Sequence, residues 1–379
     1  MRALFFCTPG AGHLLPLLPL IRAFRGRGDT VAVCTAESME SSLRAEGVEF
    51  LAAGATVEAL VAEVLRATGV DLFQGTTVET EADFFTGARI DLGFEEALAK
   101  SRAWQPDLIV AEHFDFVGPL VGAVLGVPVA SLAYGPAIQP VSVEPIASRL
   151  RGRYEERGVT YGPDRWYLDT CPPALQNAGW EEPGNRISLR PEAFRNPGQA
   201  QPPKPEGVNA RPRVLVSFGT AYALPHVIGP LVAELLTQDL DLRVTLNKSS
   251  PQDFGLTDEQ IERVEFVGFT PLVDLLQGVD VMLTHGGAGT VLGALAEGVP
   301  LVVTPLGADQ PIQAERVSAS GAGISFPLFD APAEGVVKAV NEVLIDSSYG
   351  DNARLVARQI ADMTSPADVA EQLAAAVAV

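Results

Sequence analysis

A glycine-rich run in the last third of the chain has the composition needed to hold an anion. The run reads Thr284-His285-Gly286-Gly287-Ala288-Gly289-Thr290. Glycines have no Cβ, so backbone N–H groups in such a run can approach a ligand closely. A helix is predicted from about Thr290, which can cap it, and its N-terminus carries the positive end of the helix dipole. This combination predicts a diphosphate-binding site.

A second run of small residues lies earlier in the same half of the chain. It reads Ser217-Phe218-Gly219-Thr220 and follows an apolar stretch that begins at Val214. We expect this turn to complete the diphosphate cradle from the other side. The alternative is an ordinary turn between a strand and a helix.

A histidine near the N-terminus has the properties of a general base. His13 lies in a Gly-rich turn directly after the apolar stretch Ala3–Cys7. Imidazole titrates near neutrality and can take a proton from a hydroxyl group. Glu112, after the apolar stretch Leu108–Ala111, is the candidate partner that orients the ring, with Asp115 in reserve. The alternatives are a structural histidine and solvated loop carboxylates.

Two other kinds of site, for a dinucleotide and for a metal ion, have weaker support in the sequence. Gly10 and Gly12 match the start of a dinucleotide fingerprint, with Glu37 past the next strand, but Leu15 replaces the third glycine. An NAD site stays open as an alternative. The sequence has no HExxH motif, no Cys/His cluster and no carboxylate pair at ligand spacing, so we predict no metal site.

Apolar runs alternate with helical patterns along most of the chain, which predicts parallel sheets covered on both faces. The predicted strands are Ala3–Cys7, Thr30–Cys34, Leu108–Ala111, Pro128–Ala133, Val214–Ser217, Arg243–Leu246, Val264–Phe266, Val281–Leu283 and Leu301–Thr304. A Pro-rich stretch interrupts the alternation and separates two doubly wound, Rossmann-like units. We expect domains at residues 1–197 and 213–360, a linker at 198–212, and a helix within 361–379 that packs back on the first domain. Ligands then bind at the strand C-termini, in the cleft between the domains.

The charge balance limits the partners. The 379 residues carry a formal charge of −20, which disfavours nucleic acid and anionic membrane surfaces. No apolar run has the roughly 20 residues of a membrane span. Three scattered cysteines, Cys7, Cys34 and Cys171, suit reduced thiols, so we expect a cytoplasmic protein.

The donor-end motifs resemble those of a known family. HGGAGT at 285–290 is followed by Glu297-Gly298-Val299-Pro300, then by Pro305 and Asp309-Gln310. This ordered string is similar to the signature of nucleotide-sugar glycosyltransferases with two Rossmann-like domains facing across a cleft, the GT-B fold. More narrowly, the chain resembles the actinobacterial branch that decorates macrolides and aromatic polyketides. The resemblance covers the whole chain and is strongest at 264–324.

The resemblance implies roles for individual residues. His285 and the backbone at 288–290 hold the pyrophosphate, and Asp309 and Gln310 bond the sugar hydroxyls. Phe269 falls where relatives commonly have a Trp that stacks on the base; core packing is its alternative. The residues assigned to the nucleotide sugar are Gly12, Ser217, Gly219, Thr220, Phe269, His285, Gly287, Ala288, Gly289, Thr290, Asp309 and Gln310.

Two departures from the family pattern bear on the donor. Plant relatives place a Glu that bonds both ribose hydroxyls where this chain has Gly293. A site without that carboxylate loses little when the 2′-hydroxyl is missing, so a thymidine diphosphate (dTDP) sugar is favoured over a uridine diphosphate (UDP) sugar. Gln313 stands where an Asn is usual, which leaves the local sugar contacts open.

Acceptor recognition is expected from two stretches without strong periodicity, residues 70–90 and 134–167. Aromatic side chains in or near them are candidates for an apolar pocket, with core packing as the alternative. They are Phe73, Phe84, Phe85, Phe114 and Tyr134.

These inferences combine into one expectation. The chain is an inverting, metal-independent glycosyltransferase in which His13, oriented by Glu112, deprotonates a hydroxyl of an apolar small-molecule acceptor such as a polyketide. It needs no cofactor besides the nucleotide-sugar donor. The alternatives are an epimerase or hydrolase of nucleotide sugars, a carbon-linking transferase, a glycolipid-forming transferase and a non-catalytic binding protein. Monomer and homodimer both stay open.

Overall fold

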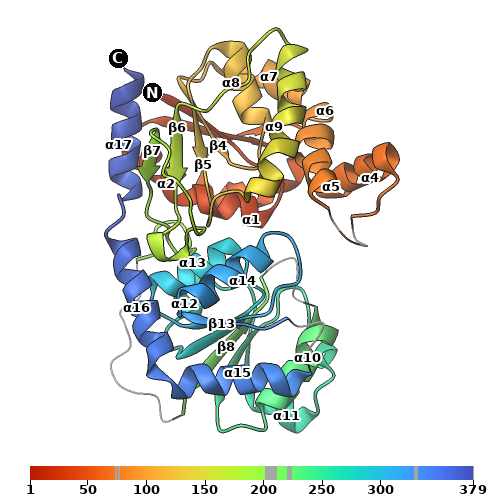
Figure 1. The fold of residues 1–379 in the computed structure, drawn as a ribbon, viewed down its shortest axis with the longest axis vertical. Coiled ribbons are helices and arrows are strands. Elements are labelled where there is room, and N and C mark those ends of the chain that lie inside the picture. The colour runs from red at the N-terminus through yellow and green to blue at the C-terminus, as the bar shows by residue number, and fades with distance from the viewer. Residues whose placement is uncertain (73–74, 76, 201–210, 220–223, 328–331, 379) are drawn as a thin grey trace. The chain divides into compact units, whose positions relative to one another are not determined.

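The computed structural model describes residues 1–379 apart from 73–74, 76, 201–210, 220–223, 328–331 and 379. The core of the predicted linker, Phe73 and Thr220 therefore lie outside the described residues. The chain divides into two compact units (Figure 1). Unit 1 comprises Met1–Thr170, Asn177–Arg190 and Thr364–Val379, and unit 2 comprises Cys171–Gln176 and Pro191–Met363.

Unit 1 is built on a seven-stranded parallel sheet with the strand order β3-β2-β1-β4-β5-β6-β7. Its strands are β1 Arg2–Phe6, β2 Thr30–Thr35, β3 Glu49–Ala52, β4 Leu108–Glu112, β5 Val129–Leu132, β6 Trp166–Asp169 and β7 Arg186–Ser188. The central strands β1 and β4 are almost wholly buried, which is why they read as continuous apolar runs rather than alternating ones.

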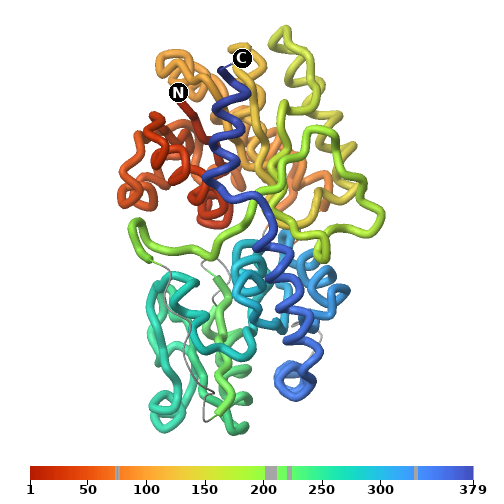
Figure 2. The backbone as a smooth tube through the Cα atoms, turned by 90° about the vertical axis from the view of Figure 1, so that its left-hand side faces the viewer, coloured from red at the N-terminus to blue at the C-terminus, as the bar shows by residue number. Residues whose placement is uncertain are grey.

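Helices cover both faces of this sheet. They are α1 Ala11–Leu14, α2 Leu18–Gly26, α3 Glu40–Leu43, α4 Val57–Thr68, α5 Val78–Ala82, α6 Arg89–Asp91, α7 Phe94–Trp104, α8 Val117–Leu125, α9 Pro140–Glu155 and α17 Pro366–Val377. The C-terminal helix α17 packs against α2, so both ends of the chain belong to unit 1 (Figures 1 and 2). Ser365 caps α17 by accepting a hydrogen bond from the N–H of Asp368.

Two glycines bring α8 unusually close to the sheet. A Cβ at Gly118 would lie 2.9 Å from Cβ of Phe6, and a Cβ at Gly122 would overlap the side chain of Val129. The two glycines are four residues apart and share one face of the helix. Their missing side chains therefore set the distance between α8 and the strands β1, β4 and β5.

Unit 2 repeats the architecture with a six-stranded parallel sheet of order β10-β9-β8-β11-β12-β13. Its strands are β8 Arg213–Ser217, β9 Asp241–Thr245, β10 Val264–Val267, β11 Val281–Thr284, β12 Leu301–Val303 and β13 Gly323–Ser325. Its helices are α10 Pro225–Leu235, α11 Asp258–Glu262, α12 Leu272–Leu275, α13 Ala288–Ala296, α14 Gln310–Ala319, α15 Ala333–Ile345 and α16 Ser347–Ala361.

Alternate residues of β8 enter two separate cores, which shows that both faces of the second sheet are covered. Val214 and Val216 pack with residues of α10 and α15. Leu215 packs with residues of α13, α14 and α16. This arrangement confirms the predicted doubly wound fold.

The strand order explains how residues far apart in sequence come together. In each sheet the connection reverses direction beside the first strand, between β1 and β4 in unit 1 and between β8 and β11 in unit 2. Loops that follow these neighbouring strands diverge to opposite faces and leave room for a ligand at the strand C-termini. His13 follows β1 and Glu112 ends β4; Gly219 follows β8 and His285 follows β11.

Two stretches without clear periodicity are more regular than expected. Residues 134–167 contain the 16-residue helix α9. Its helical pattern is weak in the sequence because it buries only Ile146, Ala147, Leu150 and Tyr154 and has Pro145 in its interior. Residues 70–90 contain α5 and a π-helical segment, Asp83–Ala88, that leads directly into α6.

The units differ from the expected domains in their continuity. Residues 171–176 and 191–197, expected in the first domain, belong to unit 2, and residues 177–190 return to unit 1 as they form β7. Thr364–Val379 also belong to unit 1. The chain therefore passes between the units more often than a single linker implies.

We expect Gly122→Ala to lower the free energy of unfolding of unit 1 by about 1–3 kcal/mol, because the new methyl group overlaps Val129 in a packed interface. Gly152→Ala in α9 is the matched control: no atom lies within 4 Å of its Cβ position, and we expect a gain of about 0.5–1 kcal/mol. Urea denaturation followed by circular dichroism measures both. Equal effects of the two substitutions would show that α8 is not closely packed.

Candidate functional site

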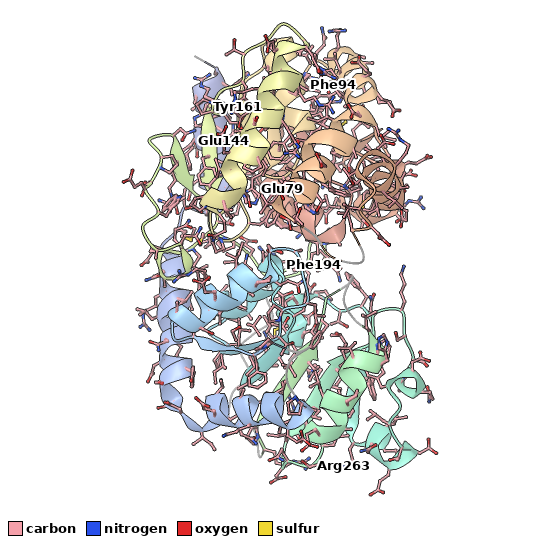
Figure 3. The ribbon with its side chains drawn as sticks, turned by 45° about the vertical axis from the view of Figure 1, so that its right-hand side comes forward. Glu79, Phe94, Glu144, Tyr161, Phe194 and Arg263 are labelled. Carbon is pink, nitrogen blue, oxygen red and sulfur yellow. The ribbon has the colours of Figure 1, made fainter. Side chains whose placement is uncertain are left out.

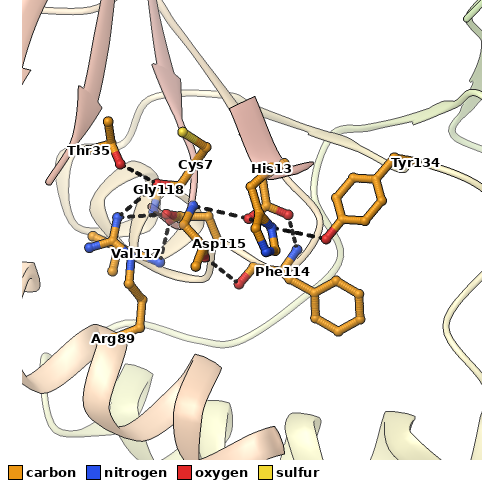
Figure 4. A network of polar contacts seen from close by, with 11 residues as sticks. Cys7, His13, Thr35, Arg89, Phe114, Asp115, Val117, Gly118 and Tyr134 are labelled. Carbon is orange, nitrogen blue, oxygen red and sulfur yellow. Dashed lines mark hydrogen bonds and ion pairs between the residues drawn. The ribbon is translucent and has the colours of Figure 1, made fainter. Parts of the chain in front are cut away.

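His13 and Glu112 form a hydrogen-bonded pair in unit 1 (Figure 4). His13 lies in the last turn of the short helix α1, and its side chain is 25% exposed. Its Nδ1 is 3.0 Å from Oε1 of Glu112. The contact uses Nδ1, so a general base at this residue would act through the other ring nitrogen, Nε2.

Glu112 is fully buried, yet its carboxylate has three hydrogen-bond partners. Oε1 accepts hydrogen bonds from the backbone N–H of Thr8 (3.1 Å) and faces His13, and Oε2 accepts one from the N–H of Phe114 (2.7 Å). Burial by itself raises the pKa of Glu112. The charge and hydrogen bond of His13, with smaller effects of His113 and the Phe114 N–H, outweigh burial and hold the pKa below its usual value. The carboxylate is therefore ionised and accepts the Nδ1 proton of His13.

Asp115, the reserve partner, has a structural position instead. Its Oδ1 accepts hydrogen bonds from the N–H groups of Val117 and Gly118 at the start of α8, both at 3.0 Å. Its Oδ2 is 2.8 Å from the guanidinium of Arg89, which also donates to the carbonyl oxygen of Cys7 (Figure 4). Arg89 and Asp115 form a fully buried ion pair. Asp115 therefore anchors the segment that follows Glu112.

Aromatic rings surround the His13–Glu112 pair. Phe85 lies 6.0 Å from the His13 ring, and Phe84 and Phe114 pack against Phe85 at 4.9 and 4.8 Å. Tyr134 contacts His13 edge to face, and its hydroxyl is 3.1 Å from Nδ1. Four of the five predicted pocket aromatics therefore form one cluster next to His13, and the fifth lies outside the described residues.

A cavity of about 270 Å³ lies in unit 1 behind this cluster. Glu112 and His113 line it, together with Tyr154, Tyr161 (labelled in Figure 3) and Asp164. Burial raises the pKa of Asp164 to about 6, against a hydrogen bond with Ser131 that lowers it. Burial lowers the pKa of His113 to about 4, so this imidazole is neutral at physiological pH.

The glycine-rich run in unit 2 encloses the His285 imidazole. A Cβ at Gly219 would lie 2.8 Å from Cε1 of His285, and a Cβ at Gly287 would lie 2.8 Å from its Nε2. Both turns of the predicted cradle therefore contact the same ring. Burial lowers the pKa of His285 to about 4, against a hydrogen bond with the Ser217 backbone that raises it. His285 is a neutral hydrogen-bonding group.

The helix after this run begins earlier than expected. Gly287 is the N-cap of α13, which starts at Ala288, and the N–H groups of Thr290 and Val291 bond to the Gly287 carbonyl. The prediction that Thr290 caps the helix is therefore wrong, because Gly287 already has the extended conformation of a cap. Thr290 lies in the first turn, and its N–H is already bonded to Gly287, so the leading N–H groups that a helix does not bond internally are those of Ala288 and Gly289.

The two predicted sugar ligands differ in accessibility. Asp309 is half-buried, and its Oδ2 accepts a hydrogen bond from Nε2 of Gln313 at 3.2 Å. Gln310 is 2% exposed, and its Oε1 accepts hydrogen bonds from the N–H groups of Leu306 and Gly307. The side-chain carbonyl of Gln310 therefore stabilises the turn before α14 through these two hydrogen bonds.

Phe269 and Gly293, the two positions expected near the nucleoside, have different surroundings. Phe269 is 67% exposed and lies 5.9 Å from the ring of Phe194, so it is a surface aromatic and not part of the core. A Cβ at Gly293 would lie 2.6 Å from Leu272 and 3.3 Å from Ala193. A carboxylate side chain at this position has no room without displacement of Leu272.

The structure also shows the surroundings of Gly12 and of the three cysteines. Gly12 is exposed in α1, one residue before His13, and nothing lies within 4 Å of its Cβ position. Cys7, Cys34 and Cys171 are buried free thiols. Within the described part of the chain, no group of three His, Cys, Asp or Glu residues could hold a metal ion, and no helix is long and apolar enough to cross a membrane.

Two contacts of the site were not anticipated from sequence. Tyr134 was considered only as pocket lining, and nothing in its sequence context indicates a contact with an imidazole 121 residues away. Arg89 was overlooked because a charged residue between Ala88 and Ile90 reads as exposed. A buried arginine within an apolar stretch signals a buried acidic partner, but the sequence does not say which.

Solved structures with this fold define the class of protein. SsfS6, a glycosyltransferase from Streptomyces sp. SF2575, superposes with a TM-score of 0.78 at 27% identity, over 98% of this chain and 99% of that one. Its complex with thymidine diphosphate gives a TM-score of 0.80 at 26% identity. The glycosyltransferase SnogD from Streptomyces nogalater gives 0.77 at 28% identity, over 100% and 99% of the two chains. The chain is a glycosyltransferase of the GT-B fold.

The family is equally clear. Residues 22–200 match the N-terminal domain, and residues 230–376 the C-terminal domain, of the family described as erythromycin biosynthesis protein CIII-like. Elloramycin glycosyltransferase ElmGT from Streptomyces olivaceus is 30% identical over an alignment 397 positions long, which covers 98% of this chain and 97% of the relative. The chain belongs to this family of antibiotic glycosyltransferases.

The lowered pKa of Glu112 predicts a pH-dependent stability difference. A carboxyl whose pKa is lower in the folded protein stabilises the fold above its unfolded pKa, and this contribution is lost as pH falls through the folded pKa. At pH 7 we expect Glu112→Gln to reduce the free energy of unfolding by about 1–3 kcal/mol. The deficit shrinks as pH falls below 4.5, the ordinary pKa of the group.

Urea titrations between pH 2.5 and pH 7 measure this difference. Glu156→Gln is the control, because this carboxylate is 62% exposed and its ion pairs contribute little. A deficit of Glu112→Gln that stayed constant across the range would contradict an ionised Glu112.

Proposed function

We propose that this glycosyltransferase transfers a sugar from a dTDP-sugar to a hydroxyl group of an apolar polyketide-type acceptor, with inversion at the anomeric carbon. His13 accepts the hydroxyl proton at Nε2 while the oxygen attacks the sugar carbon and the nucleotide leaves. The observation that carries the proposal is the 3.0 Å contact between Nδ1 of His13 and the buried carboxylate of Glu112. This carboxylate stabilises the imidazolium that forms.

A single displacement accounts for inversion. Among the described residues, Glu112 is the carboxylate in contact with His13, and its two oxygens already accept hydrogen bonds from the Thr8 and Phe114 backbone. It is buried on the Nδ1 side of the imidazole, so it supports the base and not a covalent glycosyl intermediate. One attack by the acceptor oxygen then reverses the configuration at the anomeric carbon.

The proposed donor follows from the surroundings of Gly293 and Phe269. Leu272 and Ala193 close the position at which a carboxylate could bond a ribose 2′-hydroxyl. The exposed Phe269 ring offers a face for the base. SsfS6 was solved with thymidine diphosphate, which supports the same nucleotide here.

We propose that the leaving diphosphate is held without a metal ion. The N-terminus of α13 supplies backbone N–H groups and a positive dipole end, and the neutral His285 supplies a hydrogen bond. These groups are already in place and need little rearrangement as charge develops. Activity is then unchanged by a chelator such as EDTA.

A screen of donors against acceptors tests the function. The purified chain is incubated with dTDP- and UDP-linked sugars and a panel of aromatic polyketide and macrolide aglycones, and products are identified by mass and by the anomeric coupling constant. We expect a product that is one sugar heavier than the acceptor, with dTDP donors preferred. Donor consumption without an acceptor would instead favour an epimerase or hydrolase, and binding without turnover a non-catalytic protein.

His13→Ala is expected to reduce transfer by at least about 100-fold, in the range of lost general-base catalysis. Binding of thymidine diphosphate, measured by calorimetry, stays within about twofold because His13 belongs to unit 1 and the proposed diphosphate site is built from residues of unit 2. His226→Ala, an exposed histidine in α10, keeps wild-type turnover. Normal turnover of the His13 variant would remove the base assignment.

Gly219→Ala is expected to weaken thymidine diphosphate binding by about tenfold, or 1.4 kcal/mol, because the methyl group displaces His285. Gly255→Ala is the control. Both glycines have left-handed backbones, with φ of 64° and 68°, but no atom lies within 4 Å of the Cβ position of Gly255. Calorimetry of both variants separates backbone strain from loss of the cradle, and equal affinities would place the diphosphate elsewhere.

A further inference from the structure

We propose that Tyr134 is a positioning residue for the base: its hydroxyl oxygen, together with Glu112, holds the Nδ1 proton of His13 and supports the charge of the imidazolium. The proposal rests on the proposed function of His13 as a base. It concerns a residue outside the histidine–carboxylate pair. The evidence lies in one contact, in the protonation it implies, and in how the fold holds the tyrosine.

The contact places two oxygens around one nitrogen. Oε1 of Glu112 is 3.0 Å from Nδ1 of His13, and the Tyr134 hydroxyl oxygen is 3.1 Å from the same atom. Figure 4 shows the contact between Tyr134 and the His13 ring. Both contacts are made at Nδ1, and Nε2 is the nitrogen proposed to accept the substrate proton.

The charge of Glu112 decides which atom carries the proton. An ionised carboxylate can only accept hydrogen bonds. If Nδ1 were unprotonated, its lone pair would face a carboxylate oxygen at 3.0 Å, which is repulsive. Nδ1 therefore carries the hydrogen, and the Tyr134 oxygen approaches it as a second acceptor. When Nε2 takes a proton during the reaction, both oxygens stabilise the positive ring.

The fold holds Tyr134 firmly in this position. It follows β5 and is 8% exposed. The Thr170 hydroxyl donates to the carbonyl of Ala133 at 2.7 Å and accepts from the N–H of Gly135 at 3.4 Å, so one side chain clamps the backbone on both sides of the tyrosine. The His113 ring packs against the Tyr134 ring at 4.6 Å.

Tyr134→Phe tests the proposal, because it removes one oxygen and keeps the ring. Imidazole nitrogens are followed by NMR in the full chain labelled with ¹⁵N-histidine, and the four histidines are distinguished by the loss of the His13 signals in His13→Ala. We expect the wild-type His13 to carry its proton on Nδ1. In Tyr134→Phe its titration midpoint falls by about 0.5–1 pH unit, because one hydrogen-bond acceptor for the cation is lost.

Two further variants keep the test decisive. Tyr154→Phe changes another buried tyrosine of unit 1, whose ring packs against Tyr161 and not His13, and leaves the midpoint unchanged. Thr170→Val loosens the clamp and shifts the midpoint in the same direction as Tyr134→Phe. A proton on Nε2 in the wild type, or a midpoint that is unchanged or higher in Tyr134→Phe, overturns the proposal.

Kinetics provide a second readout. With an accepted donor and acceptor, Tyr134→Phe reduces kcat by about 5–10-fold and shifts the acid limb of the pH profile to lower pH, while the KM for the donor is unchanged. A change in donor KM without a change in kcat contradicts the proposal. The NMR measurement needs no turnover, so it decides the role of Tyr134 even if the wild-type chain transfers no sugar.

Discussion

A buried carboxylate that must find hydrogen-bond donors organises the first half of this protein. Glu112 is out of contact with water and stays ionised only because His13 and the N–H groups of Thr8 and Phe114 surround it. Each donor is supplied by the loop after β1 or by the loop after β4. The parallel pairing of these strands is therefore what brings His13 and Glu112 together, and a one-residue slip would turn the carboxylate to the other face.

The packing around this carboxylate keeps it in register. Gly118 and Gly122 let α8 approach the sheet, and Asp115 ties the start of that helix to Arg89. Arg89 in turn bonds to the carbonyl of Cys7, at the beginning of the loop that carries His13. A closed set of contacts thus links α6, the two loops and α8, so that a change in any one of them is felt at His13.

The two units use the same topology for opposite electrostatic tasks. The site in unit 1 places the His13 imidazole 3.0 Å from the ionised carboxylate of Glu112. The site in unit 2 buries His285 between two glycine turns, where burial lowers its pKa to about 4 and the ring stays neutral beside a helix N-terminus. One histidine is suited to exchange a proton and the other to donate a hydrogen bond to a charged ligand. The difference comes from the surroundings, since the side chains are identical.

Much of this architecture was determined by the sequence alone. Buried parallel strands are continuous apolar runs, so the two Rossmann-like units could be predicted from local pattern. Glycine-rich turns that directly follow such strands let the backbone approach a ligand, so the His13 loop and the 285–290 loop could be predicted as well. The tertiary structure decided what local pattern does not contain. In the folded protein Glu112, and not Asp115, is the carboxylate that contacts His13. The N-cap of α13 is Gly287 instead of the predicted Thr290, and the Tyr134 hydroxyl lies beside His13. These outcomes depend on which strands lie side by side and which backbone groups need a partner, and both are set only when the sheet has formed.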